Sequence, residues 1–410
     1  MPEFLNLLPP PEALKRWREH LSIRTCAEEI ESPEALGRVT YEAVRAPHPL
    51  PTFARATVDG YAVRAEDTFG ASEALPAYLR IAGEVPMGKP AGLSLAAGEC
   101  ALIHTGGMLP GGANAVVMVE HTQSVRPEEV EVLRAAAPGE NMLKPGEDVA
   151  EGQEVIPAGV RLRPAEIGGL MALGLTRLKV ARQPRVGIIS SGDEVIPPEG
   201  VLGPGQVRDV NAYTLSALVQ ESGGRPVRYG IIPDQAEAMR RAAGKALVEC
   251  DLVAITAGSS ASTRDLTAEV INSLGAPGVL VHGVDVRPGK PTILAVCSGK
   301  PVIGLPGNPV SALVIASLFV TPVVGDLLGL QRTTPLPSVQ ARLTLNLASQ
   351  AGREDWIPVR LLPGPDGYQA EPVFGKSNLI FTLCRADGLI RIPADATGLH
   401  AGQLVEVLLA

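Results

Sequence analysis

The sequence predicts a multidomain protein in which a central α/β domain, with a doubly wound and mostly parallel sheet, is combined with β-rich domains. Its 410 residues exceed the usual size of a single domain. Hydrophobic residues make up 45% of the chain, which is enough to fill several cores. Between residues 184 and 325, apolar runs of strand length alternate with helical stretches. This alternation is typical of a parallel sheet with helices on both faces.

The region on the N-terminal side of this domain has a different pattern of apolar, charged, Gly and Pro residues. Residues 10–22 mix apolar and charged positions and predict a short amphipathic helix. Ser32-Pro33 suggests a second helix, with the serine as N-cap and the proline at the first helical position. Residues 55–135 are rich in Val, Gly and Pro and favour a small β domain. Residues 143–182 return to mixed character and include a predicted helix at residues 164–173.

The central domain is expected to contain four strands and four helices in alternation. The strands are predicted at residues 185–190, 226–232, 251–256 and 301–305, and the helices at residues 211–222, 235–248, 265–274 and 309–324. Residues 335–410 then alternate apolar and polar positions and carry a turn signal at residues 363–367. This last segment predicts a small C-terminal β-barrel or sandwich without clear helices.

Composition and charge argue against several classes of partner. The net charge is -8 and no run of Lys and Arg is present, so we expect no nucleic acid. No apolar run reaches the roughly 18 residues of a membrane span, and the N-terminus does not resemble a secretion signal. The five cysteines are scattered and form no C-x-x-C pair, which disfavours disulfides and a zinc–thiolate site. The expected compartment is therefore the cytoplasm.

Loops that follow the predicted strands are the candidate functional site, because ligands of open parallel sheets bind beyond the carboxyl ends of the strands. Ser191-Gly192-Asp193-Glu194 brings two carboxylates to the end of the first strand, although a solvated turn would have the same sequence. Asp234 follows the second strand and could instead be a helix N-cap. Both readings remain open for each loop.

Three further segments favour an anionic ligand. The small residues Gly258, Ser259 and Ser260 precede a helix, where backbone N–H groups and the helix dipole suit an anion, or else form a flexible surface loop. Asn308 can cap a helix that begins at Pro309, and the Gly- and Pro-rich loop around them could also cradle a ligand. Residues 287–291 place two cations between prolines, as either a local anion site or a charged turn.

Seven motifs occur in a fixed order along the chain. They are Asp59-Gly60-Tyr61-Ala62-Val63, Thr105-Gly106-Gly107, Leu109-Pro110-x-Gly112-Ala113, Gly146-Glu147-Asp148, Gly192-Asp193-Glu194, Pro288-Gly289-Lys290-Pro291 and Gly304-Leu305-Pro306-Gly307-Asn308-Pro309-Val310-Ser311. With these motifs the chain resembles the MoeA-type molybdopterin molybdenumtransferases, which are related to the C-terminal domain of gephyrin. The resemblance runs from about residue 30 to the C-terminus and includes Gly375-Lys376-Ser377.

The resemblance implies four structural units in each subunit. These are an elongated linking region of residues 1–50 and 143–182, a β-rich domain of residues 51–142, a molybdopterin-binding α/β domain of residues 183–326 and a C-terminal β-barrel domain of residues 335–410. It also implies a homodimer with the site between subunits, where the β-rich domain of one chain faces the α/β domain of the other. Upstream enzymes of cofactor biosynthesis are further possible partners.

The activity implied by the resemblance is the insertion of molybdate into molybdopterin-adenylate, with release of AMP and a requirement for Mg²⁺ or another divalent cation. The implied catalytic acids are Glu194, Asp265, Asp59, Asp148 and Asp234, of which Glu194, Asp234 and Asp265 would hold the cation. Arg287 and Lys290 would neutralise anionic charge. The remaining expected substrate contacts are Thr105, Gly106, Ser191, Gly192, Gly258, Ser259, Ser260, Pro306, Asn308 and Pro309.

Two alternatives fit the α/β pattern. One is the adenylyltransferase that makes molybdopterin-adenylate, which the α/β domain alone would allow. The other is a non-catalytic scaffold or oxyanion-binding protein on the same fold. Motifs outside the α/β domain, around Asp59, Thr105 and Asp148, favour the insertion step over the first, and the acidic residues favour an enzyme over the second.

Overall fold

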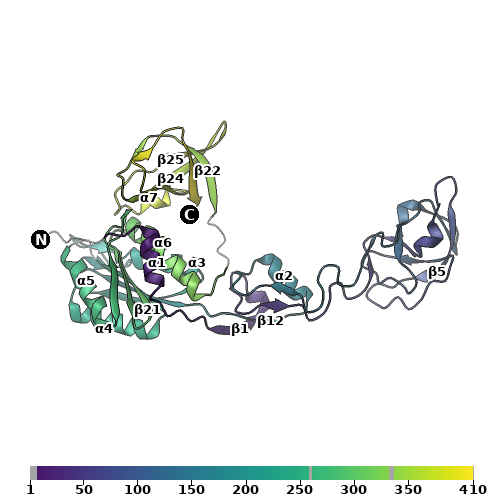
Figure 1. The fold of residues 1–410 in the computed structure, drawn as a ribbon, viewed down its shortest axis with the longest axis horizontal. Coiled ribbons are helices and arrows are strands. Elements are labelled where there is room, and N and C mark those ends of the chain that lie inside the picture. The colour runs from purple at the N-terminus through teal and green to yellow at the C-terminus, as the bar shows by residue number, and fades with distance from the viewer. Residues whose placement is uncertain (1–6, 258–260, 332–336, 410) are drawn as a thin grey trace. The chain divides into compact units, whose positions relative to one another are not determined.

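The computed structural model describes residues 7–257, 261–331 and 337–409, which form two compact units (Figure 1). The first unit comprises Met1–Tyr41, Gly159–Arg163 and Leu178–Ala410. The second comprises Glu42–Ala158 and Pro164–Arg177.

A six-stranded sheet forms the centre of the first unit. Its strand order is β16 (Arg225–Ile232), β13 (Arg185–Ser191), β17 (Leu252–Ala257), β21 (Lys300–Pro306), β20 (Ile293–Cys297) and β18 (Pro277–His282). The first four strands pair in parallel, which confirms the predicted sheet. Strands β18 and β20, which the sequence pattern did not predict, pair antiparallel as hairpins with no helix between them.

Helices cover both faces of this sheet. One core packs α1 (Pro10–Arg18), α3 (Asn211–Glu221) and α6 (Pro309–Leu327) against the strands. A second core lies under α4 (Ala236–Glu249) and α5 (Ala261–Ser273). The central strands are buried along almost their whole length, as expected of strands that are covered on both faces.

Helix α6 corrects one expectation from the sequence. Its 19 residues are long and apolar enough to cross a membrane by length and composition, although no such run was expected. Most of the helix is nevertheless buried within the first unit, where Ile315, Phe319 and Val323 have no exposed surface. Its apolar character is therefore that of a core helix.

Two predicted helix starts also differ from the structure. Ser32 does not cap an α-helix, because Ser32–Glu34 form one 3₁₀ turn that Glu31 precedes. The N–H group of Ala35 donates to the carbonyl of Ser32 at 3.1 Å, a three-residue spacing that closes the turn at once. Helix α5 begins at Ala261, four residues earlier than predicted, so that Asp265 lies inside it.

The C-terminal part of the first unit is a small closed β-barrel, as predicted. Its strands are β24 (Glu354–Gly364), β25 (Gly367–Pro372), β22 (Ser338–Leu343), β28 (Leu404–Leu409) and β26 (Gly388–Ile392), and β26 pairs back to β24. A short helix, α7 (Phe381–Cys384), was not predicted. The two-residue strand β19 (Val286–Arg287) comes from the α/β segment of the chain but pairs with β24, at the edge of the barrel sheet.

The second unit is β-rich, as predicted for this region. Its sheet has the order β7 (Ala115–Met118), β4 (Gly60–Val63), β6 (Glu99–Ile103), β5 (Ala77–Glu84), β9 (Glu129–Val132) and β8 (Thr122–Arg126). A Cβ atom on Gly60 would lie 1.9 Å from the carbonyl oxygen of Val117 on β7. Only glycine fits where these strands approach, so Gly60 has a structural role within its motif.

Candidate functional site

The loops that the sequence singles out leave one edge of the α/β sheet. Parallel registers place Ser190 beside Thr256 and Ala257 beside Pro306, so strands β13, β17 and β21 end together. Ile232 at the end of β16 pairs with Ser191 at the same edge. The carboxyl ends of four parallel strands therefore present their loops to one region, as a ligand site in an open α/β sheet requires.

Three carboxylates gather at this edge, and we call Asp193, Glu194 and Asp234 the acidic cluster. The N–H group of Asp234 donates to Oδ1 of Asp193 at 3.2 Å. Burial raises the pKa of Asp234, and the charges of Asp193 and Glu194 raise it further, while the nearby Ser191 hydroxyl offsets part of this rise. Oδ1 of Asp234 is buried without a hydrogen-bond partner. The cluster therefore holds more negative charge than its surroundings compensate.

Three expectations about the loops at this edge have different outcomes. Asp234 is not a helix N-cap, because Gln235 occupies that position before α4. Asp265 is exposed on α5, and the predicted contacts Gly258, Ser259 and Ser260 lie outside the described residues. Within the described residues, no group of three or more His, Cys, Asp or Glu side chains is placed to hold a metal ion.

The turn after β13 depends on Gly192. Its φ is +141°, and a Cβ atom there would lie 2.8 Å from Oε2 of Glu194 and from Cγ2 of Val195. The neighbouring Ser191 hydroxyl donates to the carbonyl of Thr256 at 3.2 Å, which ties β13 to β17. The sequence Ser191-Gly192 therefore shapes the backbone that carries Glu194.

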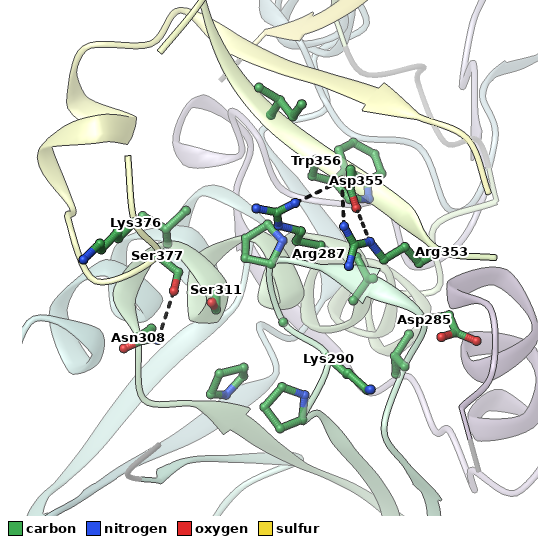
Figure 2. Close-up of a pocket in the computed structure, with 18 of the residues that line it drawn as sticks. Asp285, Arg287, Lys290, Asn308, Ser311, Arg353, Asp355, Trp356, Lys376 and Ser377 are labelled. Atoms are coloured by element: carbon green, nitrogen blue, oxygen red, sulfur yellow. Dashed lines mark hydrogen bonds and ion pairs between the residues drawn. The ribbon is translucent and has the colours of Figure 1, made fainter. Parts of the chain in front are cut away.

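A pocket of about 1110 Å³ lies between the α/β loops and the C-terminal barrel of the first unit (Figure 2). The predicted residues Arg287, Lys290, Pro306 and Asn308 line it. The pocket wall also includes residues that sequence reasoning left out of the site, namely Asp285, Ser311, Arg353, Asp355, Trp356, Lys376, Ser377 and Thr382. Most of these residues belong to the C-terminal barrel, so the barrel completes the pocket.

The charged side chains of the pocket are mainly cationic. Arg287, Lys290, Arg353 and Lys376 carry its positive charges. Asp355 is paired with arginine, with Nε of Arg353 2.9 Å from its Oδ1. Burial raises the pKa of Asp285, although the charge of Lys290 partly opposes this rise. This local excess of positive charge, on a chain whose net charge is -8, would attract an anionic ligand to the pocket.

The start of α6 joins the two walls of this pocket. Asn308 occupies the N-cap position before Pro309, but its side chain makes no cap. Nδ2 of Asn308 donates instead to Oγ of Ser377 at 3.0 Å, and the N–H group of Val310 donates to the carbonyl of Ser377 at 3.0 Å (Figure 2). The segment Gly375-Lys376-Ser377 therefore docks against the N-terminus of α6, which a sequence motif alone could not show.

The second unit holds the other predicted acids. Oδ1 of Asp59 accepts hydrogen bonds from the backbone N–H of Thr105 at 2.7 Å and from its hydroxyl at 3.0 Å. These two bonds lower the pKa of Asp59, and the charge of His104 adds a smaller effect. Gly106 follows with a φ of +85°. Asp148 is exposed on another loop of the same unit.

Comparison with known proteins identifies the class of the central domain. A family model described as "Probable molybdopterin binding domain" matches residues 187–326. Models of the MoeA N-terminal region (domain I and II) and the MoeA C-terminal region (domain IV) match residues 8–174 and 340–410.

Full-length relatives show the same relationship. A relative from Nostoc sp. named molybdopterin molybdenumtransferase is 33% identical over 91% of this chain and 86% of its own length. The Bacillus subtilis protein of that name is 30% identical over 98% of this chain and 94% of its own. The crystal structure of the molybdopterin biosynthesis protein MoeA from Pyrococcus horikoshii has a TM-score of 0.86 and is 32% identical, covering 99% of this chain and all of that one. The chain belongs to the MoeA family.

Proposed function

We propose that this chain is a molybdopterin molybdenumtransferase, which inserts molybdate into molybdopterin-adenylate and releases AMP. The cationic pocket of the first unit is the observation that carries this proposal. Molybdate and the adenylate phosphate are both anions, so four cationic side chains in one cavity supply the charge that both require. The pocket adjoins the loops of a domain whose family model is named for molybdopterin binding.

Residues of the α/β domain would orient the substrate. Arg287 and Lys290 would neutralise oxyanion charge, and Pro306 and Asn308 would form a wall for the pterin. Pro309 does not line the pocket but begins α6 directly after Asn308, and it would make this wall rigid. Ser191 and the backbone beside Gly192 would offer further hydrogen bonds. The loop of Gly258, Ser259 and Ser260 remains a predicted contact, outside the described residues.

The acidic cluster is where we propose the divalent cation. Glu194 and Asp234 leave carboxylate charge uncompensated at the sheet edge, and the orphaned Oδ1 of Asp234 fits an oxygen ligand of Mg²⁺. Asp265 would have to join them from α5, where it is exposed. When bound, the cation would neutralise phosphate charge and polarise the phosphoryl group.

The remaining predicted acids belong to the second unit. We propose a cytoplasmic homodimer in which Asp59, Thr105, Gly106 and Asp148 of one subunit complete the site of the other. Asp59 is ionised at neutral pH, as an acceptor or cation ligand requires, and its two hydrogen bonds from Thr105 lower its pKa further. Upstream enzymes of cofactor biosynthesis would deliver the adenylated pterin.

The extent of the family match favours insertion over the alternatives. An adenylyltransferase needs only the α/β domain, whereas here MoeA models also match both flanking regions. A non-catalytic oxyanion-binding protein or scaffold would have no use for the acidic cluster and its orphaned carboxylate oxygen, whereas the cationic pocket fits an oxyanion-binding protein and an enzyme equally. The relatives that are named molybdopterin molybdenumtransferase align with nearly the whole of this chain.

AMP release from molybdopterin-adenylate tests the proposal. We expect release that needs both molybdate and Mg²⁺, and that falls at least tenfold in Lys290→Ala and in Asp234→Asn, because each removes a charge that the substrates require. Glu371→Gln, which changes an exposed barrel residue outside the pocket, serves as the control. Folded wild-type protein that releases no AMP with any oxyanion or divalent cation would overturn the enzymatic assignment in favour of a scaffold.

A further inference from the structure

Two arginines of the pocket share one buried carboxylate. Oδ1 of Asp355 lies 2.9 Å from Nε of Arg353, and Oδ2 lies 3.4 Å from Nη2 of the same guanidinium. Oδ2 also lies 3.7 Å from Nη1 of Arg287 (Figure 2). All three side chains line the pocket, and we call them the arginine pair and its carboxylate.

The backbone explains why these residues meet. Strands β19 and β24 pair in parallel, with Arg287 directly opposite Asp355. Residues that are paired in this way project from the same face of a sheet, and Arg353 lies two positions before Asp355. One strand therefore supplies the carboxylate, and segments from both walls of the pocket supply the guanidinium groups.

Neutralising Asp355 does not require both arginines. Asp355 is 2% exposed, and a carboxylate this buried needs a charged partner, which the two-point contact with Arg353 provides. The side chain of Arg287 is 64% exposed and stands beyond hydrogen-bonding distance of the carboxylate. Because Arg353 alone neutralises Asp355, the charge of Arg287 gives the three side chains together a net charge of +1 at the pocket wall.

Most hydrogen-bond donors of the pair are unused. Among residues 7–257, 261–331 and 337–409, the hydrogen bonds of the Arg353 side chain are those from Nε and Nη2 to Asp355, and the Arg287 side chain makes none. A guanidinium carries five N–H donors in a planar fork that matches oxyanions. The free donors therefore suit a tetrahedral oxyanion in the cavity.

We propose that Asp355 is a positioning residue, which holds Arg287 and Arg353 together so that their free N–H groups bind the oxyanion substrate. Two guanidinium groups repel each other, and the carboxylate between them offsets that repulsion. Asp355 thus assists anion binding although it is itself an anion. This inference rests on the proposed function for the identity of the oxyanion as molybdate.

The other charged groups around the pair do not replace this role. Lys290 and Asp285 lie on the α/β side of the pocket, where the charge of Lys290 opposes the rise that burial causes in the pKa of Asp285. Lys376 lies on the barrel segment that docks on α6 through Ser377. Asp355 is the carboxylate that contacts the arginine pair in the described structure.

Molybdate titration of the full-length protein tests the inference without turnover. Simple charge counting predicts that Asp355→Asn binds molybdate more tightly, because a negative charge is removed. Positioning by Asp355 predicts the opposite, a loss of about tenfold in affinity measured by isothermal titration calorimetry. In turnover assays the KM for molybdate should rise by a similar factor, while the KM for molybdopterin-adenylate stays within twofold.

Glu371→Gln is the matched control, because it breaks the Arg360–Glu371 pair of the same barrel at an exposed position. Arg353→Lys keeps a charged partner for Asp355 but loses the two-point contact, so it covers the case in which Asp355→Asn does not fold. We expect it to weaken molybdate binding several-fold. Unchanged or tighter molybdate binding by either folded variant would overturn the inference. Molybdate binding that follows the prediction in a protein without AMP release would overturn the proposed reaction alone.

Discussion

Asp59 and Asp234 show how the same side chain acquires different properties from its surroundings. Two donors from Thr105 lower the pKa of Asp59, which is exposed in the second unit. Burial and two neighbouring carboxylates raise the pKa of Asp234 at the edge of the α/β sheet. The ionised form of Asp59 is stabilised by its hydrogen bonds, whereas the ionised form of Asp234 is destabilised and would be stabilised by a bound cation.

Asp234→Asn is expected to stabilise the protein at neutral pH. Because the pKa of Asp234 is raised in the folded chain, its contribution to stability is fully present below the ordinary pKa of about 4 and is lost as the pH rises through the raised value. The variant should therefore melt at a higher temperature than the wild type at pH 7, with a difference that disappears toward pH 4. Mg²⁺ should raise the melting temperature of the wild type more than that of the variant. Asp366→Asn, in an exposed turn, is the control, and a variant that melts lower at pH 7 would contradict this account.

Thr105→Val should raise the pKa of Asp59 part of the way to its ordinary value. The substitution removes the hydroxyl donor but keeps the backbone N–H, which is the larger of the two effects on this pKa. A carbon-detected NMR titration of the Asp59 carboxyl group measures the change. Thr122→Val in the same unit removes a hydroxyl that donates to the carbonyl of Val119 and should leave Asp59 unaffected. No change at Asp59 in Thr105→Val would show that the hydroxyl bond does not form in solution.

At the residue scale, the sequence predicted those site residues that occur in compact motifs. Arg287, Lys290 and Asn308 were expected, and the structure places them in one pocket. Arg353 and Asp355 were not expected, because they lie in a charged stretch at the start of a barrel strand that no local pattern distinguishes from surface residues. Their proximity to Arg287 depends on a strand pairing between segments more than 60 residues apart.

At the scale of elements, the alternating pattern predicted the four parallel strands and the four helices of the central domain. It missed β18 and β20, because no helix separates these strands from their antiparallel neighbours: residues 283–292 connect β18 to β20, and a two-residue turn connects β20 to β21. The barrel was predicted from alternation and turn signals, whereas the short α7 has too few residues to show a helical period.

The loop that carries Arg287 and Lys290 depends on one glycine. Gly289 has a φ of +119°, and a Cβ atom there would lie 2.3 Å from Cγ1 of Ile315 on α6. Gly289→Ala should therefore lower the free energy of unfolding by about 1–3 kcal/mol, through overpacking and backbone strain, and should weaken molybdate binding. Chemical denaturation and molybdate titration measure the two effects.

Gly244→Ala in α4 is the matched control for this loop. Nothing lies within 4 Å of its added Cβ atom, and the residue is inside a helix. Alanine there should raise the free energy of unfolding by about 0.5–1 kcal/mol. If Gly289→Ala were as stable as Gly244→Ala, the packing of this loop on α6 would not be what fixes Arg287 and Lys290.

At the scale of the molecule, the predicted acids belong to two compact units. Asp59 and Asp148 lie in the second unit, whereas Glu194, Asp234 and the cationic pocket lie in the first. The proposed homodimer resolves this division, because a site formed from one unit of each subunit needs residues of both. Such an arrangement places two equivalent sites in each dimer.

Mixing two inactive variants distinguishes a shared site from a site within one chain. Asp59→Asn impairs the second unit and Lys290→Ala impairs the first. If each site combines the second unit of one chain with the first unit of the other, a randomly exchanged 1:1 mixture contains one intact site in every heterodimer, and about a quarter of wild-type activity should return. AMP release after co-expression of the two variants measures this recovery, with each variant alone as the reference. Activity no higher than that of the parents, in a mixture shown to contain heterodimers, would mean that each subunit supplies its own complete site.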